Sequence, residues 1–204
     1  MEISRVFKKH YRSVGTVVAT FVLVALIATF AQPLKYGTQA KLLVVQSFGA
    51  EADPYAASRL NEYLSGLLVQ VISSESFFNQ TLDAGFSIER NYFSGTRQQQ
   101  IKRWEKTIDA RSSYDSGIII LTVYHPDKAQ AENIANAAIY TLKTTNSFYH
   151  SIPNVSVRTI DSPSTSRWPV RPNVVLNAAA GLAFGLLASG LYIYSTENKK
   201  GLWG

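Results

Sequence analysis

The residues that could carry chemistry in this chain are three histidines and two aspartates. His10, His125 and His150 lie far apart in the sequence, and none stands at the spacing that places two metal ligands on one helical face. We predict no metal site, and we interpret His125 as a turn residue. Asp109 and Asp115 flank a predicted strand and could form the carboxylate pair that glycoside hydrolysis needs, although solvated turn carboxylates are the simpler interpretation.

Composition excludes several further classes of protein. The chain has no cysteine, so disulfides, thiolate metal sites and cysteine nucleophiles are ruled out. It contains no P-loop, GxGxxG, GxSxG or HExxH motif, and we predict neither a cofactor nor enzyme activity. The net charge is +6, but residues 32–172 hold 14 basic and 12 acidic side chains without a basic stripe, so no nucleic-acid binding is expected.

Two uncharged apolar segments dominate the two ends of the chain. Residues 14–31 form a run of about 18 residues, nearly enough for a helix to cross the hydrocarbon core of a bilayer. A cleaved signal peptide is the alternative, but this run exceeds the usual apolar length and lacks a clean small-residue cleavage site. Residues 174–194 are equally free of charge, and a helix buried in a soluble protein is the alternative there. We predict two transmembrane helices.

Within the second apolar segment, small residues recur at four-residue steps. Gly181 and Gly185 form a GxxxG pattern, and Ser189 continues the row by one turn. Such a row lets two helix backbones approach closely in lipid. Glycine is also common in membrane helices without such a role. The pattern predicts a helix-packing surface.

The distribution of basic residues sets the expected orientation. Four cations lie in residues 1–13, whereas only Lys35 and Lys41 closely follow the first segment. By the positive-inside rule the N-terminal stub is cytoplasmic. Two crossings return the tail, residues 195–204, to the cytoplasm and leave residues 32–172 outside. The lipid bilayer is therefore an expected partner.

The outer region shows alternating strand and helix patterns. Strand-forming residues and three- and four-residue apolar spacing predict a small sheet with helices packed on it, an α+β domain on a transmembrane helical hairpin. The predicted strands are residues 36–46, 110–114, 117–125 and 155–160, and the predicted helices are residues 55–73, 75–82, 96–108 and 127–145.

Four of these features together resemble the bacterial polysaccharide co-polymerases, also called chain-length determinant or Wzz-like proteins. The first is the basic stub, span and strand at the start. The second and third are SSESFFNQTL (73–82) and HPDKAQAENIANAAIYTL (125–142), which are similar to the family's serine-led short helix and its Asp-Pro-x-x-Ala helix. The fourth is a Pro-rich segment, residues 162–173, that leads into the second span and contains Pro163, Pro169 and Pro172.

The region between the first two strands is too short for the long helical arms of the larger members. The chain is more similar to the short membrane adaptors that work with a separate cytoplasmic tyrosine kinase in capsule systems. This resemblance implies a homo-oligomer in the cell membrane that regulates polysaccharide chain length or export, with polymerase or export machinery as further partners.

The resemblance also implies that the tail contacts the kinase. The residues suited to such a contact are two cations and two apolar side chains, which could equally anchor the tail at the membrane surface. They are Lys199, Lys200, Leu202 and Trp203. A membrane-tethered sensor with an extracytoplasmic ligand-binding domain remains the alternative function.

Overall fold

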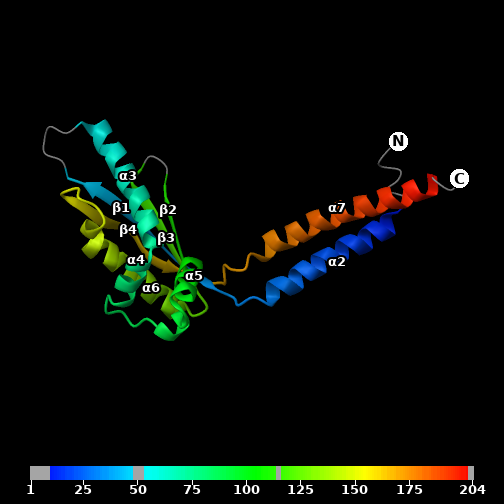
Figure 1. Cartoon of the computed structure of the whole chain (residues 1–204), viewed down its shortest axis with the longest axis horizontal. Helices are drawn as coiled ribbons and strands as arrows, with labels where there is room; N and C mark the ends of the chain where they lie inside the picture. Colours follow the sequence, from blue (N-terminus) through cyan, green and yellow to red (C-terminus); the bar gives the residue numbers. More distant parts are fainter. Residues whose placement is uncertain (1–9, 48–52, 114–115, 202–204) are drawn as a thin grey trace. The chain divides into compact units, whose positions relative to one another are not determined.

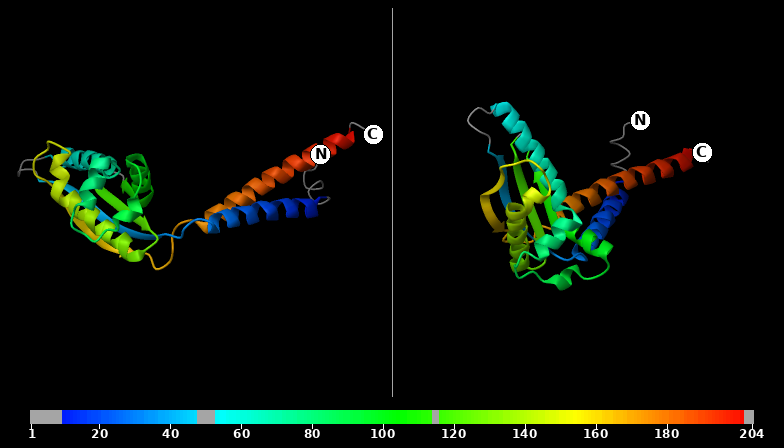
Figure 2. Two further views of the ribbon diagram at one scale, coloured as in Figure 1. Left: turned by 60° about the horizontal axis from the view of Figure 1, so that its bottom comes forward. Right: turned by 60° about the vertical axis from the view of Figure 1, so that its left-hand side comes forward.

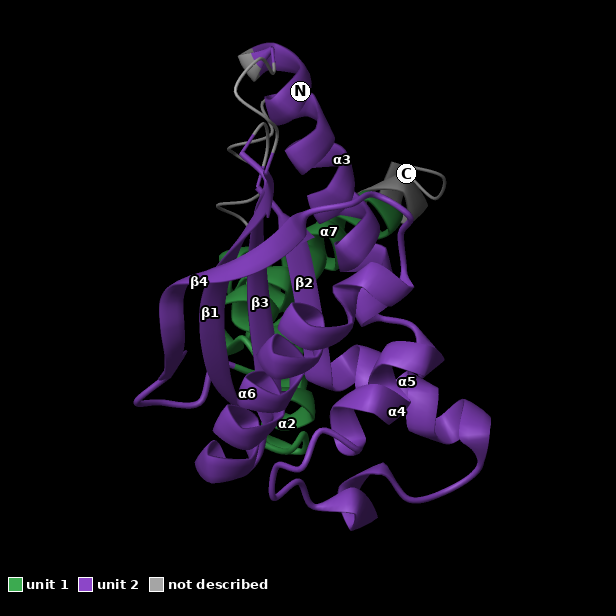
Figure 3. Cartoon of the chain, turned by 90° about the vertical axis from the view of Figure 1, so that its left-hand side faces the viewer, with its two compact units in different colours: residues 1–34, 171–204 green, residues 35–170 purple. Residues whose placement is uncertain are grey.

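The computed structural model describes residues 10–47, 53–113 and 116–201, apart from the side chains of residues 54 and 197–201. The chain forms two compact units (Figure 3). Residues 35–170 make one unit, and residues 1–34 together with 171–204 make the other.

The unit of residues 35–170 is built on an antiparallel sheet with the strand order β2-β3-β1-β4. Burial alternates along the two central strands, because successive side chains of a strand point to opposite faces of the sheet. The α+β prediction for this region is confirmed. The strands are β1 (Tyr36–Gln46), β2 (Ile108–Ser112), β3 (Ile118–His125) and β4 (Val155–Thr165).

Helices cover one face of this sheet (Figure 2). Side-chain caps start three of them: Asp53, Ser74 and Asp127 each accept a hydrogen bond from a backbone N–H in the first helical turn. The helices are α3 (Pro54–Ile72), α4 (Glu75–Leu82), α5 (Arg97–Thr107) and α6 (Lys128–Thr145), with short 3-10 turns η1 (Arg90–Phe93) and η2 (Asn146–Phe148).

The core between sheet and helices contains an aromatic cluster around Trp104. The indole of Trp104 is fully buried, and its ring centroid lies 5.3 Å from that of Phe78 and 6.0 Å from that of Phe93. Its Nε1–H donates a hydrogen bond of 2.9 Å to the backbone oxygen of Ile72, at the end of α3. The indole thus satisfies a carbonyl that a helix end leaves without an intrahelical partner.

The predicted bounds of strands β2 and β4, and the end of the helix before β2, are wrong. The spacing of Ile101, Trp104 and Ile108 extended the predicted helix to residue 108, but Ile108 has an extended backbone and pairs with Val123 of β3. Strand β2 therefore begins two residues earlier than expected. A β-branched residue such as Ile108 suits a strand, and pairing with β3 decides its conformation.

The last strand is also longer than predicted, because β4 continues to Thr165 instead of ending at residue 160. Its final residues pair with the start of β1, at Thr38 and Gln39, after register shifts between Gln39 and Leu42. Pro163 lies in this irregular part of the strand. Proline is tolerated there because β4 is an edge strand and needs no N–H for a further neighbour.

The other unit consists of helices α2 (Tyr11–Phe30) and α7 (Val174–Gly201), which lie side by side and antiparallel (Figure 1). Each has the length and apolar composition needed to cross a membrane. The apolar run does not end α7: the helix continues through the predicted tail to Gly201, because residues 195–200 contain neither proline nor glycine.

Candidate functional site

Of the two carboxylates considered for catalysis, Asp109 and Asp115, the structure describes only Asp109. Asp109 is half-buried at the start of β2, and one carboxylate oxygen accepts a hydrogen bond of 2.9 Å from Arg111 of the same strand. Asp115 lies outside the described residues. Among the residues that the structure describes, no three His, Asp or Glu side chains are placed to hold a metal ion.

His125, predicted to be a turn residue, is the buried last residue of β3 and lies directly before the turn. It ends β3 with 3% of its surface exposed and lies edge-on to Tyr92, with ring centroids 4.2 Å apart. The backbone N–H of Asp127 lies 3.0 Å from its Nδ1, and the carbonyl oxygen of Asp127 lies 3.2 Å from the same nitrogen. Burial lowers the pKa of the imidazole, outweighing the raising effect of Asp127. The contact with Asp127 links the end of β3 to the turn that leads into α6.

The predicted small-residue row lies in the contact between α2 and α7. A Cβ atom added to Gly181 would lie 2.9 Å from Cβ of Ala25, and one added to Gly185 would lie 2.8 Å from Cα of Val18. Ser189, the third member of the row, is buried, and its hydroxyl donates to the Leu186 carbonyl. The glycines permit the close approach of the two backbones.

A polar link joins the same two helices near the other end of the row. The side-chain amide of Asn177 donates a 3.0 Å hydrogen bond to the hydroxyl of Thr29, which in turn donates to the carbonyl of Ala25. Thr29 is 1% exposed. Polar side chains in apolar helices commonly hold neighbouring helices together in this way. The pair fixes the alignment of α2 against α7.

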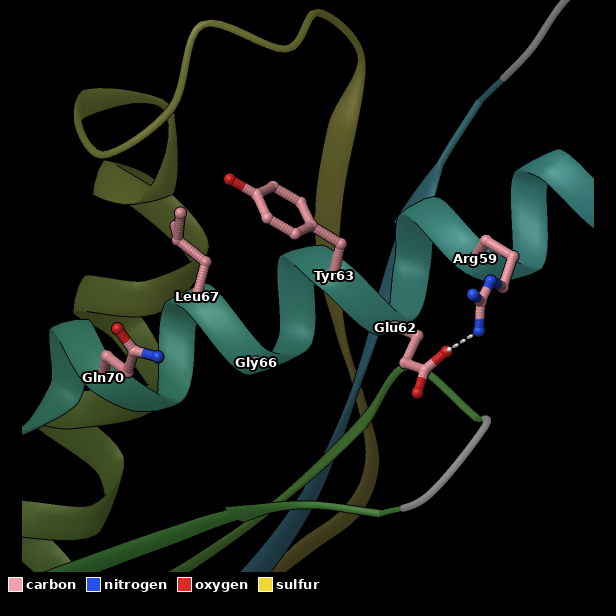
Figure 4. Close-up of a pocket in the computed structure, with 6 residues that line it drawn as sticks. All are labelled: Arg59, Glu62, Tyr63, Gly66, Leu67 and Gln70. Carbon is pink, nitrogen blue, oxygen red and sulfur yellow. Dashed lines mark ion pairs between the residues drawn. The ribbon is translucent and has the colours of Figure 1, made fainter.

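In the α+β unit, the outward side of α3 forms an open hollow of about 550 Å³, which we call the α3 face (Figure 4). Gly66 lies at its centre, and a Cβ added there would meet nothing within 4 Å. The ring of Tyr63 stands beside it, 60% exposed. The α3 face consists of Arg59, Glu62, Tyr63, Gly66, Leu67 and Gln70.

Three hydrogen bonds hold α3 so that this face stays outward. The side chain of Asn61 accepts from the backbone N–H of Gln46 in β1 at 3.0 Å. The hydroxyls of buried Ser65 and of Ser112 in β2 are 2.8 Å apart. The bond from Trp104 holds the last turn of the helix. These bonds attach α3 to the rest of the unit, and a helix already held in place loses less entropy when a partner binds.

The two ends of the α+β unit lie side by side. The hydroxyls of Thr38 and Thr165 are 2.9 Å apart, and the backbone N–H of Val170 donates to the carbonyl of Lys35. The two chain segments that connect this unit to the apolar helices therefore leave it at one place. The antiparallel pairing of β1 with β4, the first and last strands, produces this arrangement.

The remaining predicted site residues are dispersed. Pro163 belongs to β4, Pro169 lies in the segment after it, and Pro172 belongs to the unit of the two apolar helices. Lys199 and Lys200 are in the last turns of α7. Leu202 and Trp203 lie outside the described residues.

Sequence reasoning missed the α3 face. Two signals could have indicated it: a glycine in the middle of a helix, where it costs about 1 kcal/mol relative to alanine, and a tyrosine on the polar side.

Comparison of the sequence with protein-family models gives no match, and comparison with curated proteins finds no similar sequence.

Proposed function

We propose that the chain is a non-enzymatic membrane protein that regulates the chain length or export of a surface polysaccharide. In this proposal α2 and α7 cross the bacterial cell membrane, both termini are cytoplasmic, and residues 32–172 lie outside. The observation that carries it is the α+β unit whose two ends lie side by side and continue into two mutually packed apolar helices. This arrangement fits the resemblance to the short polysaccharide co-polymerases.

The tail has a defined part in the proposal. Because α7 continues to Gly201, Lys199 and Lys200 belong to a helix that extends beyond the apolar run. We propose that this end of the helix, with Leu202 and Trp203, contacts a separate cytoplasmic tyrosine kinase. Truncation after residue 195 should then lower phosphorylation of the kinase while leaving the protein in the membrane. Unchanged phosphorylation would exclude the adaptor role.

We propose the α3 face as the contact between copies in a homo-oligomer. Tyrosine and arginine are the residue types that most often dominate interfaces, and Tyr63 and Arg59 supply them here. Gly66 leaves space for a neighbouring side chain or helix to come close. The row of Gly181 and Gly185 is already occupied by α2, so it does not serve this contact.

Gly66→Ala separates folding from assembly. The added methyl group has open space around it, so the helix should become more stable, by about 0.5–1 kcal/mol. If copies meet at this face, the same change lowers cross-linking between protomers in intact membranes. Phe148→Ala, which removes an aromatic ring 75% exposed elsewhere on the unit, is the control. A stabilised Gly66→Ala protein with unchanged cross-linking would exclude the α3 face.

The function itself is tested by deleting the gene and separating the surface polysaccharide by size. We expect an altered length distribution of the polysaccharide or reduced export, restored by the intact gene.

The topology is tested separately by introducing single cysteines, which are the only thiols because the chain has no cysteine of its own. A cysteine introduced at exposed Ser147 should react with a membrane-impermeant maleimide on whole cells, and one at Ser195 should react only after lysis. The reverse pattern would refute the orientation.

A further inference from the structure

The end of the α+β unit that joins the apolar helices carries a basic and aromatic patch. Lys128 links its parts: its Nζ donates a 3.0 Å hydrogen bond to the carbonyl of Arg167 and lies 4.6 Å from the centroid of the Tyr36 ring. The Trp168 side chain, next along the chain, is 75% exposed. We call this set the basal patch, and it consists of Lys35, Tyr36, Lys128, Arg167, Trp168 and Val170.

The patch is positively charged. Lys35, Lys128 and Arg167 form no ion pair with any residue that the structure describes. The adjacent carboxylate, Asp127, accepts a hydrogen bond from the backbone N–H of Gln130 and caps α6. Elsewhere on the unit, several basic side chains are paired, as Lys41 is with Asp161. The three cations of the basal patch thus remain available for an anionic partner.

The basal patch also exposes apolar groups, so its partner must accommodate both positive charge and hydrophobic surface. Trp168 makes no ring contact with another described residue, and Val170 beside it is 43% exposed. Tryptophan favours the boundary between lipid headgroups and hydrocarbon, where its indole has one apolar and one polar side. A membrane surface offers both environments at once.

Chain continuity brings that surface within reach. Lys35 follows the end of α2 by five residues, and Trp168 precedes the first residue of α7 by six. Even fully extended, six residues span only about 20 Å. Within the proposed membrane topology, the patch therefore stays close to the outer headgroups.

We infer that the basal patch binds the anionic phospholipid headgroups of the outer leaflet, with Trp168 inserted at the interface. The inference rests on the proposed membrane insertion and adds a lipid partner to it. It also gives a role to Arg167. In the proposed topology this cation lies outside the membrane, where the positive-inside rule predicts few basic residues. Each cation near an anionic surface contributes about fivefold to the ratio of bound to free protein.

The test uses the full chain reconstituted into vesicles, with Trp203→Phe as background and brominated lipids as quenchers. The contribution of Trp168 is the difference between this protein and Trp203→Phe/Trp168→Phe, because Trp104 is fully buried and common to both. We expect stronger quenching and a blue-shifted emission in vesicles of phosphatidylglycerol and phosphatidylcholine than in phosphatidylcholine alone. High salt should reduce the difference, since it screens exposed charges.

A matched pair of triple variants separates the patch from overall charge. Replacing Lys35, Lys128 and Arg167 by glutamine should abolish the dependence on anionic lipid, whereas replacing Lys102, Lys143 and Arg158, exposed cations elsewhere on the unit, should leave it unchanged. Equal quenching of Trp168 in both vesicle types, or equal effects of both triple variants, overturns the inference. Flotation of the same samples shows whether the chain is in the bilayer, so failure of membrane insertion is recognised independently.

Discussion

Replacing Gly185 by alanine should force α2 and α7 apart. The new Cβ atom would lie 2.8 Å from Cα of Val18 and 3.3 Å from Cβ of Phe21. Favourable carbon–carbon separations are about 3.5–4.0 Å, so α2 must retreat by about 1 Å. The Val18 atom belongs to the backbone and cannot turn away as a flexible side chain would. We expect overpacking of this kind to cost about 1–3 kcal/mol.

Gly190→Ala provides the matched control. It makes the same chemical change in the same helix, but a Cβ at Gly190 has no neighbour within 4 Å. Both substitutions gain the higher helix propensity of alanine to a similar extent. Any difference between them therefore measures the contact with α2.

The assay uses two cysteines in place of Thr29 and Asn177, whose side chains are hydrogen-bonded at 3.0 Å across the two helices. The natural chain has no cysteine, so a short bifunctional thiol reagent joins only this pair within one chain. Addition of sodium dodecyl sulfate to the protein in mild detergent opens the hairpin and abolishes the cross-link. The midpoint should fall for Gly185→Ala and not for Gly190→Ala. Equal midpoints for the two variants would refute the close-packing argument.

Three further predictions concern the α+β unit, measured by urea unfolding of the full chain in detergent and followed by circular dichroism. Trp104→Phe should lower the free energy of unfolding by about 1–3 kcal/mol, because the buried carbonyl of Ile72 loses its hydrogen-bond donor. A decrease of less than about 0.5 kcal/mol would contradict this. Ser74→Ala should lose about 1 kcal/mol through its bond to the Phe77 N–H, whereas alanine at exposed Ser73 should change little. Burial lowers the pKa of His125, so the unfolded chain binds a proton on this residue more readily than the folded chain does. The free energy of unfolding should therefore be highest above the ordinary histidine pKa of about 6.5 and fall at lower pH. His125→Asn should reduce this pH dependence.

Local signals in the sequence sufficed for much of the fold. The spacing of apolar residues predicted helices at residues 55–73 and 75–82, within a residue of the observed bounds of α3 and α4. Strand β1 was predicted at residues 36–46, where it lies, because this segment is rich in strand-forming residues. In these segments the intrinsic preference of the residues and the tertiary structure agree.

The errors arose where distant residues decide the structure. The extra length of β4 depends on pairing with Thr38 and Gln39, more than 120 residues away, so no local window reveals it. Ile108 fits either the helix or the strand, and the contact with Val123 selects the strand. Likewise, the openness of the α3 face follows from which side of α3 the sheet covers. A hydrophobic stripe predicts the buried side of a helix but not what surrounds the other side.

The glycines of this chain lie in two different environments. Gly181 and Gly185 lie against α2, whereas Gly66 faces open space in the α+β unit. A methyl group at Gly185 therefore meets backbone of the same chain, and one at Gly66 meets only what binds from outside. If assembly in the membrane depended on the glycines of α7, it would compete with the hairpin for one surface. In the proposed assembly, the two helices form the membrane hairpin and the copies meet at the α3 face. Gly185→Ala and Gly66→Ala should then affect different measurements.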